Sequence, residues 1–361
     1  MKRPLHTPLC ELLGLRHPIL LAGMAGGPTT PELVAAVSQA GGLGVFGATG
    51  MTADALGEAV RTACELTGAP VGVNVLVAPP TEGNPHPDAV QQALAPFRRE
   101  LGIPHPAPPS PVRPSTAIEL VEAGLAAGAR VLSVGLGDPA TIAPIARSAG
   151  VPLLAMASTV EDAVAAAGAG ADVIVAQGAE AGGHRSNFTL GPRGEVPLIG
   201  TMALVPQVVA AVDVPVVAAG GIMDGRGLVA ALALGAAGAQ YGTLFLATRE
   251  SGASDLYKDR VVSAADTDTL VTAAVTGRPA RMLRSRLVQS MIEGPQPLGW
   301  PRQAPATMDV RAAADRAGRG DLAVHLAGQA AGMSPAGRPG AADVVMSIID
   351  EALATIERLS D

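Results

Sequence analysis

The side chains best suited to chemistry lie in one short stretch, residues 177–185, which reads Gln-Gly-Ala-Glu-Ala-Gly-Gly-His-Arg. An amide, a carboxylate, an imidazole and a guanidinium are interspersed with glycines there, directly after the apolar run 172–176. Glycine lets a backbone approach a ligand closely, and an imidazole can exchange a proton near neutral pH. The stretch therefore predicts a ligand-binding loop at a strand end that carries titratable groups to the ligand. A plain turn that carries a surface histidine is the alternative.

Glycines and isolated polar residues also occur in or after other apolar runs. Residues 22–27 read Ala-Gly-Met-Ala-Gly-Gly and leave room for a flat ligand, while Asn74 is a lone amide inside the run 71–76. A buried amide needs a hydrogen-bond partner, which for Asn74 could be a ligand or neighbouring backbone. Residues 218–222 and 239–243 end two further runs in glycine, and backbone amides at such places can bind phosphate. We therefore expect a phosphorylated ligand.

Several other kinds of function find no support in the sequence. Cys10 and Cys64 form no CxxC or Cys/His cluster, so neither a metal site nor a disulfide is expected, which suits a cytoplasmic protein. No GxSxG elbow or Walker loop occurs, and Gly220-Gly221 does not complete a GxGxxG fingerprint. The formal net charge of -7 argues against nonspecific nucleic-acid binding, and no stretch has the pattern of a membrane span. A bound cofactor is therefore expected to carry the chemistry.

A repeating unit predicts how these residues are brought together. An apolar run, a glycine-bearing turn and an alanine-rich helical stretch recur, and the runs lie at 18–21, 43–46, 71–76, 131–134, 151–156, 172–176, 214–219 and 239–241. Strands this uniformly apolar are typical of a parallel sheet with helices on its faces. Eight units predict an α/β fold, a (β/α)8 TIM barrel over residues 1–250, whose strand-end loops share one rim. An open doubly wound sheet is the alternative.

Two segments depart from this repeat. Residues 78–114 follow the third strand, are rich in proline and include a helical piece at 89–101. This insertion could be a lid, a substrate wall or a solvated loop. Residues 251–361 are expected to form a helical extension that belongs to the same catalytic unit and packs against the barrel or reaches over its mouth. The pattern at 343–359 predicts a final amphipathic helix, which could serve a homodimer interface.

Taken together, these motifs resemble the nitronate monooxygenases, formerly called 2-nitropropane dioxygenases. The matching stretches run in order along the chain, at residues 14–20, 24–27, 31–33, 40–44, 72–74, 177–185, 219–222, 240–243 and 277–281. The string 177–185 is the most specific. Gly23 and Ser186 depart from the family pattern, which usually has proline and more commonly glycine at these two positions. The resemblance implies a TIM barrel with flavin mononucleotide (FMN) as its cofactor.

The resemblance also implies roles for individual residues. The FMN contacts would come from Met24, Ala25, Asn74, Gln177, Gly182, Gly221, Gln240, Gly242 and Thr243. Met24 and Ala25 would line the ring, Asn74 and Gln177 would hydrogen-bond the cofactor, and the others would lie largely around its phosphate. His184 would sit over the reactive face, where it deprotonates a nitroalkane or orients a bound nitronate. Oxygen would then be consumed, and a carbonyl compound and nitrite released.

Two alternatives remain at this point. The flavin-dependent enoyl-acyl-carrier-protein reductases share the string from Gln177 to His184, and they would use NAD(P)H and an enoyl thioester. Arg185 and residues 277–281 favour the nitronate interpretation. A barrel that binds FMN without turnover is the second alternative. Glu180 is assigned to loop structure or to fixing a neighbouring arginine.

Overall fold

The computed structural model describes residues 5–103, 113–191 and 194–361. Its centre is an eight-stranded sheet with the strand order β1-β9-β8-β6-β5-β4-β3-β2, in which the paired strands are parallel. The strands are β1 (Ile19–Leu21), β2 (Gly44–Gly47), β3 (Val71–Leu76), β4 (Val131–Gly135), β5 (Leu153–Ala157), β6 (Val173–Gln177), β8 (Val216–Ala219) and β9 (Gly238–Tyr241). The ends of the sheet meet, because the amide of Leu21 donates to Leu43 O at 2.8 Å and that of Leu43 donates to Ile19 O at 2.9 Å. The predicted (β/α)8 barrel is confirmed.

Prolines account for the largest differences between the predicted runs and the observed strands. The predicted runs beginning at 18, 151 and 214 include Pro18, Pro152 and Pro215, whereas the strands begin at Ile19, Leu153 and Val216. Each of these prolines accepts a backbone hydrogen bond from the adjacent strand through its carbonyl oxygen. Proline has no N–H to donate, so it can precede a strand but cannot take a full place in the ladder.

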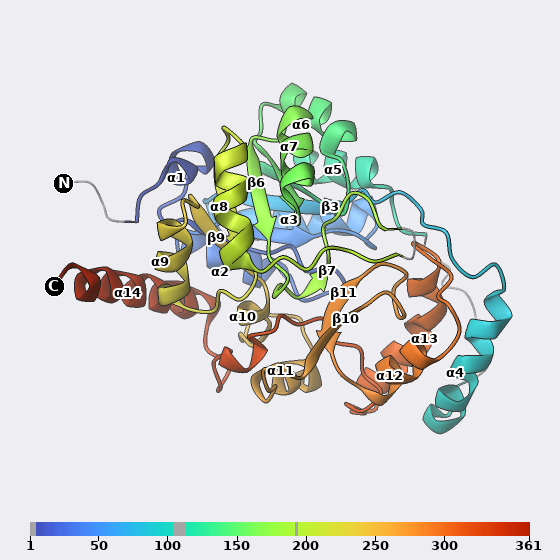
Figure 1. Cartoon of the computed structure of the whole chain (residues 1–361). Coiled ribbons are helices and arrows are strands. Elements are labelled where there is room, and N and C mark those ends of the chain that lie inside the picture. Colours follow the sequence, from blue (N-terminus) through green and yellow to red (C-terminus); the bar gives the residue numbers. More distant parts are fainter. Residues whose placement is uncertain (1–4, 104–112, 192–193) are drawn as a thin grey trace.

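Helices surround the sheet, as Figure 1 shows. They are α2 (Pro31–Gln39), α3 (Ala53–Leu66), α5 (Ala117–Ala126), α6 (Ala143–Ala149), α7 (Val160–Gly168), α8 (Thr201–Ala211) and α9 (Gly225–Ala233), with short 3-10 turns at Pro139–Thr141 and Ala331–Met333. Several start at a threonine or aspartate whose side chain accepts a hydrogen bond from the backbone of the first turn. Among the described residues, no helix combines the length and apolar character that crossing a bilayer requires.

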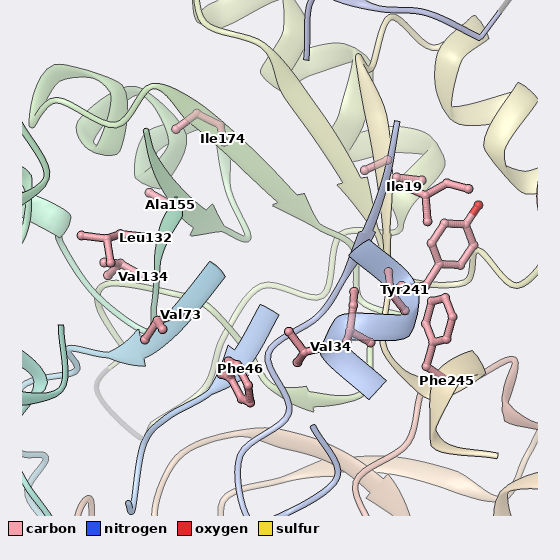
Figure 2. Packing of buried hydrophobic residues seen from close by; sticks show 14 of the residues in the cluster. Ile19, Val34, Phe46, Val73, Leu132, Val134, Ala155, Ile174, Tyr241 and Phe245 are labelled. Atoms are coloured by element: carbon pink, nitrogen blue, oxygen red, sulfur yellow. The ribbon is translucent and has the colours of Figure 1, made fainter. Parts of the chain in front are cut away.

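The core has two layers because both faces of the sheet are covered. The outer layer packs strand residues such as Phe46, Val73 and Ile174 against helix residues such as Val34 (Figure 2). The inner layer fills the barrel with the alternate strand residues Leu20, Val45, Leu154, Val173, Val175 and Val217. Helix α1 (Pro8–Leu13) joins this inner cluster through its own apolar side chains, so its packing continues that of the barrel interior.

A second, smaller sheet, which the sequence analysis did not predict, joins two strands that follow the barrel to a short strand in the loop after β6. Its strands are β10 (Thr269–Thr272), β11 (Ala280–Leu283) and β7 (Gly183–His184), paired antiparallel in that order. The helices that follow the barrel strands are α10 (Thr243–Leu246), α11 (Asp255–Val262), α12 (Arg286–Glu293), α13 (Gln303–Arg316) and α14 (Ala341–Ser360). Helix α14, the predicted final helix, packs against α9 and α2 and thus joins the helical layer of the barrel.

The proline-rich insertion contributes helix α4 (Pro87–Leu101), which lies against α13 and α12 (Figure 1). The guanidinium of Arg98 is buried and donates to the Asp309 carboxylate at 2.6 Å. The helix therefore supports the C-terminal region, while the start of the insertion bonds directly to a loop of that region. There the amide of Thr81 donates to Trp300 O at 2.9 Å. Prolines 108, 109 and 111 lie outside the described residues.

Candidate functional site

The alternation of side chains along the barrel strands places three amides on the inner face of the sheet. In β6, Val173 and Val175 belong to the inner cluster, and Gln177 follows at the same spacing. The residues flanking Asn74 in β3 and Gln240 in β9 belong to the outer cluster, so these two side chains also face inward. All three amides are buried. Three separate strands therefore deliver amides to the barrel interior, towards the ends from which the strand-end loops begin.

Gln177 is held almost completely by the protein. Its Oε1 accepts hydrogen bonds from Ser158 Oγ and from the backbone amide of Ser186, both at 2.9 Å. Its Nε2 donates to the carbonyl oxygen of His184 at 2.9 Å. One N–H is left for a ligand, so the main effect of Gln177 is to fix the loop that carries His184.

Asn74 and Gln240 keep more of their hydrogen-bonding capacity. Asn74 Nδ2 donates to Ser133 Oγ at 2.9 Å, while its Oδ1 has no partner among the described residues. The side chain of Gln240 is only 7% exposed and makes no hydrogen bond within the same ranges. Buried amides are nearly always satisfied, so both groups are suited to a bound ligand or an ordered water.

The loop after β6 is built around Glu180. Its carboxylate accepts from the backbone amide of Thr201 at 2.9 Å and from Thr201 Oγ1 at 2.8 Å, which caps the start of α8. A Cβ at Gly178 would overlap Thr201 Oγ1 and approach this carboxylate. The buried Arg185 donates to the carbonyl oxygens of Gly178 and Gln177, at 2.5 and 2.9 Å. Glu180 therefore stabilises the structure of the loop, which is one of its two expected roles. Arg185 stabilises the same loop through its hydrogen bonds to two backbone carbonyl oxygens.

His184 lies in β7, at the junction of the barrel and the small sheet. It is paired with Ala280 of β11, and the amide of Arg185 donates to Pro279 O at 2.8 Å. Its Nε2 is 3.1 Å from Thr276 Oγ1, and its ring meets Trp300 edge to face with centroids 5.4 Å apart. The loop that carries this histidine comes from the barrel, but the groups that contact its ring come from the C-terminal region.

The surroundings of His184 determine its charge and its tautomer. Burial and the positive charges of Arg278 and Arg311 lower the pKa of His184 to about 4, so the ring is neutral at neutral pH. Thr276 Oγ1 donates its single proton to Arg278 O at 3.0 Å. Its oxygen is left to accept from the imidazole, which places the ring proton on Nε2 and leaves Nδ1 as the basic atom.

Close backbone contacts fix the two groups that touch the imidazole. Gly277, which follows Thr276, has φ +88°, and a Cβ there would lie 2.5 Å from the carbonyl carbon of Gly299. Gly299, which precedes Trp300, has φ +78°, and a Cβ there would overlap Thr81 O. The Trp300 amide donates to Thr81 Oγ1 at 2.7 Å. The insertion, the Thr276 loop and the Trp300 loop therefore meet at backbone contact distance, and the insertion supports a wall of the site.

The predicted residues near the chain start also lie at the rim. A Cβ on Gly47, at the end of β2, would overlap the backbone of Met24 and Ala25, so these two residues pass directly over that strand end. A Cβ on Gly242, at the end of β9, would lie 3.8 Å from Met24 Sδ. A Cβ on Gly23 would lie 2.6 Å from Asn74 Cβ. The first, second, third and last barrel strands therefore bring their predicted residues together.

The remaining predicted residues are joined by Gly328 of the C-terminal region. Its amide donates to Thr243 Oγ1 at 2.9 Å. A Cβ on Gly182 would lie 2.5 Å from the same amide nitrogen, and one on Gly221 would lie 3.4 Å from Glu180 Cβ. The loops after β6, β8 and β9 thus form one continuous surface, against which residues 327–329 pack.

Sequence reasoning missed four side chains around His184, namely Thr276, Arg278, Trp300 and Arg311. Trp300 is the single tryptophan of the chain, and Arg278 lies within the family-like stretch 277–281, so both carried a usable signal. Thr276 and Arg311 carried none, because neither belongs to the repeat. Within the described ranges, no cluster of three or more His, Cys, Asp and Glu side chains is arranged to hold a metal ion.

Comparisons with known proteins agree on one group of enzymes. A model of the nitronate monooxygenase family matches residues 6–351. A probable nitronate monooxygenase of Staphylococcus saprophyticus is 44% identical over 295 residues, covering 80% of this chain and 81% of that protein. Among solved structures, nitroalkane oxidase from Streptomyces ansochromogenes is 36% identical with a TM-score of 0.87, covering 97% of this chain and 99% of the other. FabK from Thermotoga maritima is 31% identical with a TM-score of 0.76, covering 98% of each chain.

Proposed function

The chain belongs to the nitronate monooxygenase family, and we propose that it is an FMN enzyme that oxidises alkyl nitronates with oxygen to carbonyl compounds and nitrite. Membership in this family makes it a flavin-dependent oxidoreductase, so the alternative of a barrel without turnover is set aside. The cofactor, the co-substrate and the products are the parts that we propose.

The groups at the rim fit a flavin. The amide of Gln240, Asn74 Oδ1 and one N–H of Gln177 are available in the barrel interior, and a flavin ring offers both donors and acceptors along its edge. A Cβ on Gly26 or Gly27 would meet nothing within 4 Å, so small residues border open space there. We propose that these groups hold the ring, with Gly182, Gly221, Gly242 and Thr243 around the phosphate. When bound, the flavin accepts electrons from the substrate and passes them to oxygen.

His184 is the residue that would act on the substrate. Its Nε2–H is held by Thr276, so Nδ1 is the atom that can accept a proton or a hydrogen bond from the substrate. The T-shaped contact with the Trp300 ring restricts rotation of the imidazole. His184 thus orients the substrate through one atom while the C-terminal region fixes the other.

The single observation that carries the proposal is that this imidazole is neutral and has two guanidinium groups near it. A proton taken from a neutral nitroalkane would create an imidazolium in a positive field, which the low pKa of His184 disfavours. A nitronate is already an anion, so it is stabilised by the same field and needs no such proton transfer. The site therefore suits nitronates better than nitroalkanes.

The second candidate is an enoyl reductase that uses NAD(P)H and an enoyl thioester. The specific observation in its favour is the likeness to FabK over 98% of both chains, which is weaker than the likeness to the nitroalkane oxidase. An enoyl thioester carries no charge at its reacting end. The two arginines near His184 would have no evident task with that substrate, so we place this function second.

One experiment separates these functions. Purified protein is loaded with FMN and its visible spectrum recorded, and oxygen uptake and nitrite release are measured with ethyl nitronate. NADH and NADPH oxidation with crotonyl thioester is measured in parallel. We expect oxygen uptake with nitrite release and no steady NAD(P)H oxidation. The reverse result would establish the reductase, and failure to bind FMN would reject both functions.

A further inference from the structure

Arg311 differs from the other arginines near the candidate site in having no partner. Arg278 donates to Asn187 O at 2.6 Å, and Arg281 donates to Ala179 O and Thr269 Oγ1 at 2.8 and 2.9 Å. Arg311 makes no hydrogen bond or ion pair with any residue in the described ranges, and its Nε is inaccessible to solvent. Arg311 is partly buried, and a guanidinium that is withdrawn from water without an anion is costly, so its retention needs a reason.

The face of α13 that carries Arg311 points to the segment that contacts His184. Gln303 Nε2 donates to Ala274 O at 2.7 Å, and Thr307 Oγ1 donates to Val275 O at 3.1 Å. Residues spaced by four lie on one face of a helix, so Arg311 extends this row. The first two members bond to the carbonyls just before Thr276. Arg311, the third member of the row, has no such partner, yet its positive charge contributes to the low pKa of His184.

The carboxylate expected to pair with Arg311 is bound to other groups. Asp315 lies one turn further along α13, where an ion pair with Arg311 would be favourable. Asp315 Oδ1 instead bonds His325 Nε2 and accepts from Ser254 Oγ, both at 2.9 Å. The ring of His325 is stacked on Tyr257 with centroids 4.1 Å apart.

The groups that face Arg311 therefore supply no free anion. Its charge acts on His184, His325 and Tyr257, and Arg260 and Arg278 add positive charge to the same region. Tyr257 OH donates to Leu326 O, and burial raises its pKa, so it stays neutral. The region between α13 and β7 therefore carries net positive charge.

We propose that Arg311 binds the anionic nitro group of the nitronate beside His184 and so makes the site select anions over neutral nitro compounds. The planar guanidinium offers paired N–H donors that match two oxygens of a planar anion. The inference rests on the proposed function. If that function holds, Arg311 positions and selects the substrate, and His184 contacts the same substrate.

The test compares Arg311→Gln, Arg311→Lys and Arg316→Gln in the FMN-loaded enzyme. Arg316 is exposed on the same helix, so its variant matches the loss of charge without touching the site. We expect Arg311→Gln to lower kcat/KM for ethyl nitronate about 10- to 100-fold, mainly through KM, because a charge-assisted bond is lost. The value for nitroethane should change far less. Arg311→Lys should recover part of the loss, and Arg316→Gln should match the parent.

Two further readouts do not depend on turnover of nitronate. Nitrate, a planar oxyanion, should bind the parent in calorimetry and bind Arg311→Gln about tenfold or more weakly. The acid limb of the pH profile should move to higher pH in Arg311→Gln, since removing a positive charge raises the pKa of His184.

Different results would overturn the role of Arg311 and the proposed function. Equal losses for nitronate and nitroethane, or unchanged nitrate binding, would overturn the assignment of Arg311. Weaker FMN binding with unchanged nitronate kinetics would also overturn it, by assigning the anion to the cofactor phosphate. A parent enzyme inactive on nitronate would reject the proposed function instead. In that case loss of nitrate binding in Arg311→Gln would still establish the anion site.

Discussion

The barrel rim and the C-terminal region build the two sides of the site with different chemistry. The rim offers glycines, backbone and amides, as at Asn74 and Gln240, and it holds the Glu180 carboxylate in a helix cap. The C-terminal region offers a hydroxyl, an indole and two guanidinium groups around His184. The rim is therefore suited to holding a neutral flat ligand and its phosphate, whereas the C-terminal region sets charge and proton position.

This difference implies that FMN binding and substrate turnover can be altered separately. Changes in the C-terminal region should alter the handling of substrate while the cofactor stays bound. Changes at the close contacts of the C-terminal region should weaken the whole assembly, because Gly182 meets the backbone of residues 327 and 328, and Gly299 meets the backbone of the insertion, with no room for a side chain.

The largest effect is expected from His184→Asn, which removes the one side chain that both regions position. If His184 is the substrate-facing group, kcat/KM for nitronate should fall about 10²- to 10⁴-fold, the usual contribution of such a group. FMN affinity, measured by fluorescence titration, should stay within a few-fold of the parent. Loss of FMN binding in this variant would show that His184 contacts the cofactor, and it would contradict the division of tasks between the rim and the C-terminal region.

Gly299→Ala tests the backbone contact behind Trp300. The new methyl group would overlap Thr81 O at a residue with φ +78°, so we expect a loss of about 3 kcal/mol or more in the free energy of unfolding. Gly337→Ala is the matched control, because Gly337 has the same φ but open space around it. It should lose only about 1 kcal/mol from strain. Urea denaturation of both variants measures the difference, and equal losses would show that the contact is not tight.

The rim could be predicted from the sequence because the barrel repeats. Apolar runs and glycine-bearing turns recur along the chain, so Asn74 was singled out as a lone amide inside a strand and Gln177 as the start of a strand-end loop. Residues 177–185, which include His184, were predicted to form a ligand-binding loop because they follow one of these apolar runs. Apolar runs and glycine-bearing turns involve residues that are neighbours along the chain, so they can be recognised from the sequence alone.

The other side of the site could not be predicted because it depends on tertiary contacts. Thr276 and Arg311 reach His184 through the pairing of β7 with β11 and through the face of α13. A two-residue strand such as β7 has no periodic pattern to detect, and a partly buried arginine without a partner is indistinguishable in sequence from an exposed one. The small sheet was missed for the same reason.

The low pKa of His184 predicts an acid sensitivity that the C-terminal region imposes on the barrel. In the unfolded chain the imidazole has its ordinary pKa near 6.5, whereas in the folded protein its pKa is about 4. Between these values the unfolded state binds more protons, so stability present above about pH 6.5 is lost as the pH falls towards 4. We expect a loss of about 2 to 3 kcal/mol from this residue.

His184→Asn provides the comparison for that loss. The variant should keep the acid sensitivity of the carboxylates and of His325, whose pKa burial also lowers, and lose only the part due to His184. The measurement is the free energy of unfolding by urea at pH 7 and pH 4.5 in both proteins. Identical pH dependence would mean that neither burial nor the two arginines lower the pKa of this imidazole in the folded protein.

The smallest effect is expected from Thr276→Val, which tests whether the C-terminal region sets the tautomer. The change keeps the shape of the side chain but removes the oxygen that accepts from His184 Nε2 and donates to Arg278 O. Losing one neutral hydrogen bond should lower kcat for nitronate by about tenfold or less. FMN binding should be unchanged, and Thr276→Ser, which restores the hydroxyl, should recover most of the rate. If serine fails to restore it, the methyl group and its packing matter, and the position of the proton on His184 is not set by Thr276.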